Sequence, residues 1–271
     1  MKHVLSVQDL SCMGRCSLTV ALPIFSAMGC RCSVLPTTVL STHTGFPQPH
    51  RRGLTEHIAP IAQHWQQVGA SFDAIGVGYL ADPRQAEAVE DVLSRFPALT
   101  VVDPAMGDHG KLYSSITPEQ VAAMARLCKK GNILLPNVTE AAFLTGLPYR
   151  QSNDLAYLKE LNAGMREFGA DGVVITGVSG KDGKIGFFGS AGQEEFSYET
   201  DSVENHSHGT GDMFAAVLLG GIMAGKTVQD AAILAARFVE RTLANSPKAS
   251  PHGAEFEKQL PWLCQQLNSV M

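Results

Sequence analysis

Short apolar runs recur along the first two thirds of the chain, and stretches with helical spacing separate them. The runs cover residues 3–7, 33–35, 74–77, 99–102, 133–135 and 172–176. Runs of this length, rich in Val, Ile and Leu and followed by turn-forming residues, are typical of strands that are buried on both faces. Because helical stretches alternate with them, the pattern predicts an α/β fold with a mostly parallel central sheet and helices on both faces.

Capping signals and amphipathic spacing indicate where the helices lie. Ile58, Ile61 and Trp65 share one helical face. Asp82-Pro83 and Thr117-Pro118 each place a capping side chain before a proline, which is typical of a helix start. The other predicted helices cover residues 17–28, 211–224, 228–243 and 256–267, and one more begins at residues 139–140.

Two segments depart from this alternation. Residues 184–188 and 194–198, joined through glycines, are predicted to form an antiparallel hairpin at one end of the sheet. Residues 36–52 are polar, contain Pro and His, and have few apolar side chains to anchor them, so we expect a mobile flap there. No linker, repeat or low-complexity segment interrupts the chain, which favours a single domain over residues 1–271.

Composition excludes several classes of protein. Hydrophobic residues make up 45% of the chain and charged residues 17%, which suffices for a large core without disulfides. The net charge of −5, without a long Lys or Arg run, argues against nucleic acid as a partner. The longest apolar run, residues 213–224, is shorter than the ~20 residues of a membrane span. The start of the chain resembles a strand rather than a signal peptide, so we expect a cytoplasmic protein with no membrane partner.

The cysteines point to no metal site. They occupy positions 12, 16, 30, 32, 128 and 264, and none forms the C-x2-C pairs of a zinc centre. We expect reduced thiols and assign no catalytic cysteine.

The stretch from His208 to Ala216 carries the first chemical signal. Gly209, Thr210 and Gly211 precede an apolar helical run, so their amides are predicted to lie at a helix N-terminus, where an anion binds well. Asp212 follows them and suits a base beside that anion, which suggests phosphoryl transfer. The alternative is a tight turn with an ordinary first-turn Asp.

Polar residues also gather at one edge of the predicted sheet. Tyr79, Asp103, Asn137 and Thr176 each fall at or just after the carboxyl end of a predicted strand. Ligands of open α/β sheets bind at that edge. The sequence therefore places a ligand site in front of the Gly209–Asp212 stretch.

Several short motifs along the chain match a known family. They comprise residues 5–8, 41–45, 78–79, 103–108, 136–140, 174–176 and 209–212. In this order and spacing the chain resembles the ribokinase-like superfamily and, within it, the pyridoxal/pyridoxamine kinases. The resemblance implies a three-layer ribokinase-like fold and ATP-dependent phosphorylation of the 5′-hydroxymethyl group of vitamin B6 vitamers (pyridoxal, pyridoxamine, pyridoxine).

The resemblance implies roles on the phosphate side. Gly209, Thr210 and Gly211 would donate amides to the γ-phosphate, and Asp212 would accept the proton of the substrate hydroxyl. Magnesium is expected with ATP, and possible monovalent cation (K⁺) binding is implied as well. The residues matched to metal and nucleotide are Asp103 and Glu140 for the metal, and Asp108, Tyr113, Asn137 and Thr176 for ATP. Asn137 as a turn residue and Glu140 as a first-turn acid are the structural alternatives.

On the substrate side, Tyr79 matches a tyrosine that packs against the pyridine ring, and His43 and Thr44 match the flap. Two positions depart from the family pattern. Asp9 replaces a serine, which would favour a protonated ring nitrogen or an aminomethyl group, so pyridoxamine or pyridoxine should be used at least as well as pyridoxal. A Gly-x-x-Gly-Asn pattern is replaced by Gly14-Arg15-Cys16-Ser17-Leu18.

Other functions remain open at this level. A hydroxymethylpyrimidine kinase of thiamine synthesis would share the site and a flat heteroaromatic substrate. A sugar kinase fits less well, because the early Gly-Gly motif of that branch is missing. A non-catalytic vitamer-binding protein would have lost the base or the anion site, and both sets of residues are present. The resemblance also implies a homodimer.

Overall fold

The computed structural model describes residues 1–151, 154–180, 183–203, 205, 207–248 and 250–268. Within them, the main sheet has nine strands in the order β11-β10-β9-β8-β5-β4-β1-β2-β3. The strands are β1 (His3–Ser11), β2 (Arg31–Leu40), β3 (Arg51–Gly53), β4 (Ala74–Val77), β5 (Leu99–Val102), β8 (Ile133–Leu134), β9 (Gly172–Ser179), β10 (Lys184–Ala191) and β11 (Glu194–Asp201). The strands from β9 to β2 pair in parallel, and β3, β10 and β11 are antiparallel.

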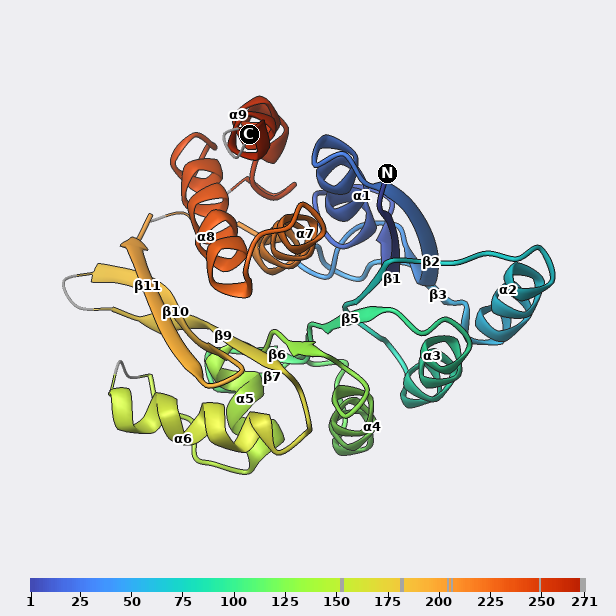
Figure 1. The fold of residues 1–271 in the computed structure, drawn as a ribbon, viewed down its shortest axis with the longest axis horizontal. Coiled ribbons are helices and arrows are strands. Elements are labelled where there is room, and N and C mark those ends of the chain that lie inside the picture. The colour runs from blue at the N-terminus through green and yellow to red at the C-terminus, as the bar shows by residue number, and fades with distance from the viewer. Residues whose placement is uncertain (152–153, 181–182, 204, 206, 249, 269–271) are drawn as a thin grey trace.

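Helices cover both faces of this sheet, as Figure 1 shows. On one face lie α2 (Thr55–Gln67), α3 (Pro83–Arg95), α4 (Pro118–Cys128), α5 (Val138–Thr145) and α6 (Leu155–Arg166). On the other lie α1 (Leu18–Ala27), α7 (Thr210–Met223), α8 (Val228–Ala244) and α9 (Leu260–Asn268). The predicted α/β architecture with helices on both faces is confirmed.

The strands supply both hydrophobic cores because successive side chains point to opposite faces. Val173 and Ile175 of β9 pack with the core under α2–α6, whereas Val174 packs with the core under α1, α7 and α8. Runs of consecutive Val and Ile are therefore required here, and they are the signal by which the strands could be predicted.

The predicted helix starts are confirmed at α3 and α4. The Asp82 side chain accepts a hydrogen bond from the Arg84 amide, and that of Thr117 accepts one from Gln120, with a proline in the first turn of each helix. The predicted terminal helix is divided: residues 256–259 form a 3-10 turn, and α9 then begins at Leu260 beside Pro261. A proline fits the first turn of a helix, where its missing N–H is not needed.

The prediction of a flap over residues 36–52 is wrong at its start. Residues 36–40 belong to β2, and β3 pairs with them from the other end of the segment. Thr37 and Thr38 are buried there, and the Gln85 side chain donates a hydrogen bond to the Thr37 carbonyl oxygen at 2.7 Å. The strand was predicted only at residues 33–35; its continuation was missed because Thr37 and Thr38 are polar and are buried by tertiary contacts.

Two more elements were not predicted. Helix α6 buries Tyr157, Leu158, Leu161 and Met165, a helical spacing that was present in the sequence. A small hairpin, β6 (Gly107–Asp108) and β7 (Lys111–Leu112), follows β5 and forms a separate two-stranded sheet. Among the described residues, no helix is both long enough and apolar enough to span a membrane.

Candidate active site

Three of the four residues predicted at strand ends follow their strands, whereas Thr176 lies within β9, which continues to Ser179. Asp103 follows β5 and Tyr79 follows β4, while Asn137 and Thr176 are joined by an isolated parallel bridge. The N-terminus of α7 faces the same place: a Cβ atom at Gly211 would lie 3.9 Å from Oδ2 of Asp103. The structure therefore brings Asp103 next to the Gly209–Asp212 stretch.

Gly209 shapes the start of α7. It is the N-cap, with φ of 85°, and a Cβ atom there would lie 2.1 Å from the Arg15 carbonyl oxygen. Both the positive φ and the close approach require glycine. Intrahelical bonding begins with the Met213 amide, which donates to the Gly209 carbonyl oxygen at 3.0 Å. The amides of Thr210, Gly211 and Asp212 precede it and are the N–H groups that a helix leaves for an anion.

Asp212 lies in the first turn of α7, half-buried and surrounded by protein atoms. The pKa of its carboxyl is raised to about 7, chiefly by desolvation and to a smaller extent by the Asp9 charge, while the backbone of Ser17 lowers it. A carboxylate with this pKa binds a proton far more readily than an exposed Asp. It therefore has the basicity that a general base needs near neutral pH.

Glu140 and Asn137 form a capping box at the start of α5. Glu140 is buried and accepts hydrogen bonds from the amides of Asn137 at 2.8 Å and Met106 at 2.9 Å. The Asn137 side chain donates to the Gly107 carbonyl oxygen at 2.8 Å. These bonds hold the loop after Asp103 against α5. Burial raises the pKa of Glu140 to about 7.

Asp103 completes an acidic cluster with Asp212 and Glu140. Burial raises the pKa of Asp103 well above its usual range, and the charges of Glu140 and Asp212 add to this effect. Among the described residues, no group of three or more His, Cys, Asp or Glu side chains could enclose a metal ion by itself. Magnesium at phosphate-transfer sites uses one or two carboxylates, waters and phosphate oxygens, and the cluster fits that kind of site.

The residues matched to the nucleotide are more exposed. Asp108 lies on β6, where its side chain accepts a hydrogen bond from the His109 amide at 2.8 Å. Tyr113 is 45% exposed, and burial together with the charges of Glu140, Asp108 and Asp103 raises the pKa of its phenol. Its backbone N–H donates to the Met106 carbonyl oxygen at 2.9 Å, so Tyr113 lies next to the loop after Asp103.

A small cavity extends from Asp103 and Asp212 inward, between the sheet and helices α1 and α7. Ser6 and Gln8 of β1 line it, and the Gln8 side chain donates a hydrogen bond to Oγ of Ser6 at 3.0 Å. Gln8 belongs to a motif that the sequence singled out, but no role was assigned to it. Gln8 lies two positions after Ser6 on β1, so the two side chains point to the same face of the sheet.

The substrate-side residues occupy different environments. His43 is buried and its Nε2 donates to the Pro251 carbonyl oxygen at 2.8 Å, while Nδ1 accepts from the Gly45 amide. Tyr79 is half-buried, and its hydroxyl bonds Oγ of Ser115 at 3.1 Å. Thr44 is exposed. His43 is thus no freely exposed loop residue, and its ring lies 4.6 Å from that of His208, next to the anion loop.

Asp9 is also buried, with 4% of its surface exposed. Its carboxylate accepts hydrogen bonds from the hydroxyl groups of Ser11 and Ser17. The sequence matched Asp9 to the substrate site, and in the structure both of its carboxylate oxygens accept hydrogen bonds from protein donors. Ser17 has a part in this geometry that the sequence did not indicate.

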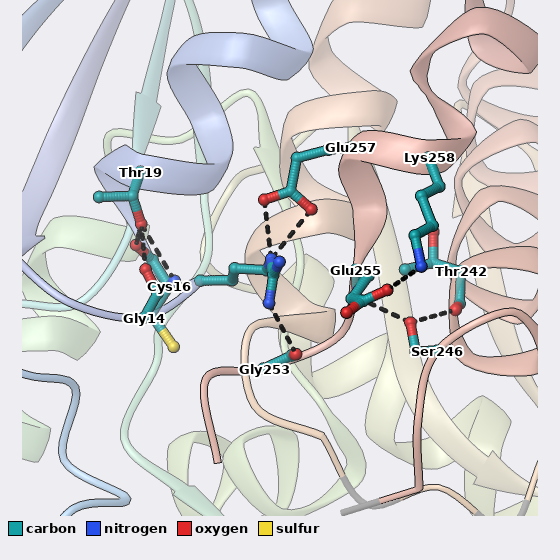
Figure 2. A network of polar contacts seen from close by, with 10 residues as sticks. Gly14, Cys16, Thr19, Thr242, Ser246, Gly253, Glu255, Glu257 and Lys258 are labelled. Atoms are coloured by element: carbon teal, nitrogen blue, oxygen red, sulfur yellow. Dashed lines mark hydrogen bonds and ion pairs between the residues drawn. The ribbon is translucent and has the colours of Figure 1, made fainter. Parts of the chain in front are cut away.

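The C-terminal segment braces the loop that carries Ser17, and Figure 2 shows the contacts around Gly14, Cys16 and Gly253. Nε of Arg15 donates to both carboxylate oxygens of Glu257, at 2.7 and 2.9 Å. The Thr19 hydroxyl donates to the Gly14 carbonyl oxygen at 3.0 Å. A Cβ atom at Gly253 would lie 3.0 Å from the His208 carbonyl oxygen. Two segments from opposite ends of the chain are thereby packed around the start of α7.

Comparison with known proteins gives consistent results. The family described as phosphomethylpyrimidine kinase matches residues 22–255. A pyridoxine/pyridoxal/pyridoxamine kinase from Bordetella bronchiseptica is 31% identical over 265 residues, covering 91% of this chain and 90% of its own length.

Solved structures agree. A Bacteroides thetaiotaomicron protein assigned to the phosphomethylpyrimidine kinases and crystallised with pyridoxal is 34% identical, with a TM-score of 0.92 and coverage of 98% and 96% of the two chains. Pyridoxal kinase from Lactobacillus plantarum is 29% identical, with a TM-score of 0.91 and coverage of 100% and 99%.

Proposed function

We propose that this chain, a kinase of the phosphomethylpyrimidine kinase family within the ribokinase-like superfamily, acts on vitamin B6. In the proposed reaction it transfers the γ-phosphoryl group of ATP to the 5′-hydroxymethyl group of a B6 vitamer. One observation carries the proposal: Asp212, with its pKa raised to about 7, lies in the first turn of a helix whose free amides face the acidic cluster.

The chemistry follows from this arrangement. The substrate hydroxyl would lie between Asp212 and the γ-phosphate, and Asp212 would accept its proton as the oxygen attacks the phosphorus in line. The amides of Thr210 and Gly211, with the positive end of the α7 dipole, would stabilise the charge on the transferring group. Gly209 allows that geometry through its positive φ.

Magnesium is proposed as the metal because the donors are hard oxygen ligands. Asp103 would hold the ion directly or through water, and Glu140 would orient its water shell while it also fixes the loop after Asp103. The ion would neutralise charge on the phosphates. A monovalent cation near Asp108 and Thr176 remains part of the proposal, with the family resemblance as its support.

Vitamin B6 is favoured as the substrate by three observations. A relative that shares 31% of its residues is named for pyridoxine, pyridoxal and pyridoxamine, and a structural neighbour was crystallised with pyridoxal. Tyr79 offers a half-buried aromatic ring beside the site for a flat heterocycle. Hydroxymethylpyrimidine is the second candidate, because the matching family carries the name phosphomethylpyrimidine kinase.

A parallel assay tests the proposal. The purified protein is incubated with Mg-ATP and, separately, pyridoxal, pyridoxamine, pyridoxine or hydroxymethylpyrimidine, and ADP and the phosphorylated product are both measured. We expect turnover with the B6 vitamers, and a fall in kcat of about 10²–10⁴-fold in Asp212→Ala. Turnover with hydroxymethylpyrimidine alone would favour the second candidate. Vitamer binding without product would identify a binding protein.

A further inference from the structure

Ser17 adopts a backbone conformation that normally requires glycine. Its φ is 52° and its ψ is −123°, which are the angles of the first central residue of a type II′ turn. Only three described residues other than glycine have positive φ, and Ser17 is the one next to the acidic cluster. An L-amino acid persists in such a conformation only where its surroundings hold it.

Asp9 provides the contact that holds it. Oδ1 of Asp9 accepts the Ser17 hydroxyl at 2.5 Å, and Oδ2 accepts the Ser11 hydroxyl at 3.0 Å. All three side chains are buried, with at most 5% exposed. Hydrogen bonds to a carboxylate are stronger than those between neutral groups, and more so away from water. The Ser17 hydroxyl is thereby directed away from α1. Ser17 directly precedes this helix, but its side chain makes no capping hydrogen bond to it.

The consequence concerns the loop that ends at Ser17 and packs against the start of α7. A Cβ atom at Gly209 would lie 2.1 Å from the Arg15 carbonyl oxygen and 3.7 Å from Cα of Cys16. We propose that Asp9 is a positioning residue: through the Ser17 hydroxyl it holds the backbone of residues 15–17 against Gly209, and it thereby keeps Asp212, in the first turn of α7, in its productive orientation. This inference rests on the proposed function.

The hydrogen bond explains how a serine can occupy this position. A glycine adopts positive φ without help, whereas a serine needs a partner. Asp9 is that partner, through a single buried hydrogen bond, so it compensates for the side chain at position 17.

A double-mutant cycle tests the proposal with Asp9→Ala, Ser17→Gly and the combined variant, with kcat, vitamer KM and the free energy of unfolding measured for each. We expect Asp9→Ala to lower kcat about tenfold or more with little change in KM. In the Ser17→Gly background the same substitution should change kcat by less than about twofold, because glycine no longer needs the contact. Ser11→Ala, which removes the other bond to Asp9, is the matched control and should have the smaller effect.

Asp9→Asn is the conservative variant, since its amide oxygen can still accept the Ser17 hydroxyl. It should retain more kcat than Asp9→Ala, and it keeps the test available where the alanine variant does not fold. The proposal is wrong if Asp9→Ala is equally damaging with Ser17 and with Gly at position 17, or if it raises vitamer KM at unchanged kcat. If the wild type phosphorylates no vitamer, the proposed function fails, while the coupling in unfolding free energy still decides whether Asp9 holds Ser17.

Discussion

The backbone N–H of Asn137 donates to Oε2 of Glu140 at 2.8 Å, and the Glu140 amide donates in return to the Asn137 side-chain oxygen at 3.0 Å. The other carboxylate oxygen of Glu140 accepts the Met106 amide. One buried acid therefore connects the strand-end residue Asn137 to the loop that follows Asp103. The family resemblance implies a role for Glu140 near magnesium, and the structure gives it a role in the capping box. The same carboxylate would serve both.

Replacing Glu140 should therefore affect both stability and activity. Glu140→Ala would leave at least two buried amides without an acceptor and should lower the free energy of unfolding by about 2–4 kcal/mol. Glu140→Gln keeps one acceptor and should lose less. Denaturant unfolding measures both. Glu119→Gln, the same change at an exposed first-turn acid of α4, is the control; an equal loss there would contradict the structural role of Glu140.

Gly209→Ala should abolish most of the activity. Its Cβ atom would lie 2.1 Å from the Arg15 carbonyl oxygen, so the start of α7 must shift away from the phosphate position. The matched control is Gly225→Ala: Gly225 also has positive φ, 90°, but has open space where the Cβ atom would be placed. Both variants should lose about 1 kcal/mol of stability from the backbone strain, and Gly209→Ala should lose more because of the contact with Arg15. Only Gly209→Ala should lower kcat, as steady-state kinetics would show. Equal kcat in the two variants would argue against an anion site at Gly209.

Asp212 should make the protein less stable as pH rises. Its pKa is raised from 3.8 to about 7 in the fold, so the folded state favours the protonated carboxyl. That contribution is fully present below pH 3.8 and is lost as pH rises through about 7. Asp212→Asn removes it, so the variant should gain about 2 kcal/mol relative to wild type between pH 5 and pH 8. Unfolding curves at the two pH values measure this, and a constant difference would contradict the raised pKa.

Asp103 should determine the magnesium requirement. In Asp103→Asn, the concentration of Mg²⁺ that gives half-maximal activity should rise about tenfold, because a direct or water-mediated carboxylate ligand is lost. Removal of the metal with EDTA should stop turnover in wild type, and added Mg²⁺ should restore it. A titration that is unchanged in the variant would show that the ion is held elsewhere.

Substitutions at Tyr79 and Ser115 separate the contribution of the Tyr79 ring to vitamer binding from that of its hydroxyl group. Tyr79→Phe and Ser115→Ala each remove the 3.1 Å hydrogen bond between these side chains and should change vitamer KM by less than about threefold. Tyr79→Ala also removes the ring and should raise KM about tenfold. Steady-state KM values for the three variants decide the matter. If Tyr79→Phe is as damaging as Tyr79→Ala, the hydroxyl rather than the ring makes the important contact.

Elements with a strong local signal could be predicted from the sequence, and elements held by distant contacts could not. Apolar strands such as β4 and β5 were predicted at their observed bounds, and the proline-marked starts of α3 and α4 are confirmed. Residues 36–40 of β2 were missed because Thr37 and Thr38 are buried polar residues. Their burial comes from contacts with Gln85, 47 and more positions away, which local periodicity does not contain.

The sequence by itself determined the α/β class, the order of most elements and the placement of Tyr79, Asp103, Asn137 and Asp212 at one edge, because hydrophobic periodicity and capping are local properties. Only the tertiary structure decided what Asp9 and Glu140 contact. Asp9 meets Ser17 and approaches Asp212 because α1 and α7 pack on the same face of the sheet, and Glu140 meets Met106 because α5 lies beside the loop after β5. Hydrogen bonds and pKa shifts depend on the distances between segments that are far apart in the sequence. Those distances are set only when the helices pack onto the two faces of the sheet.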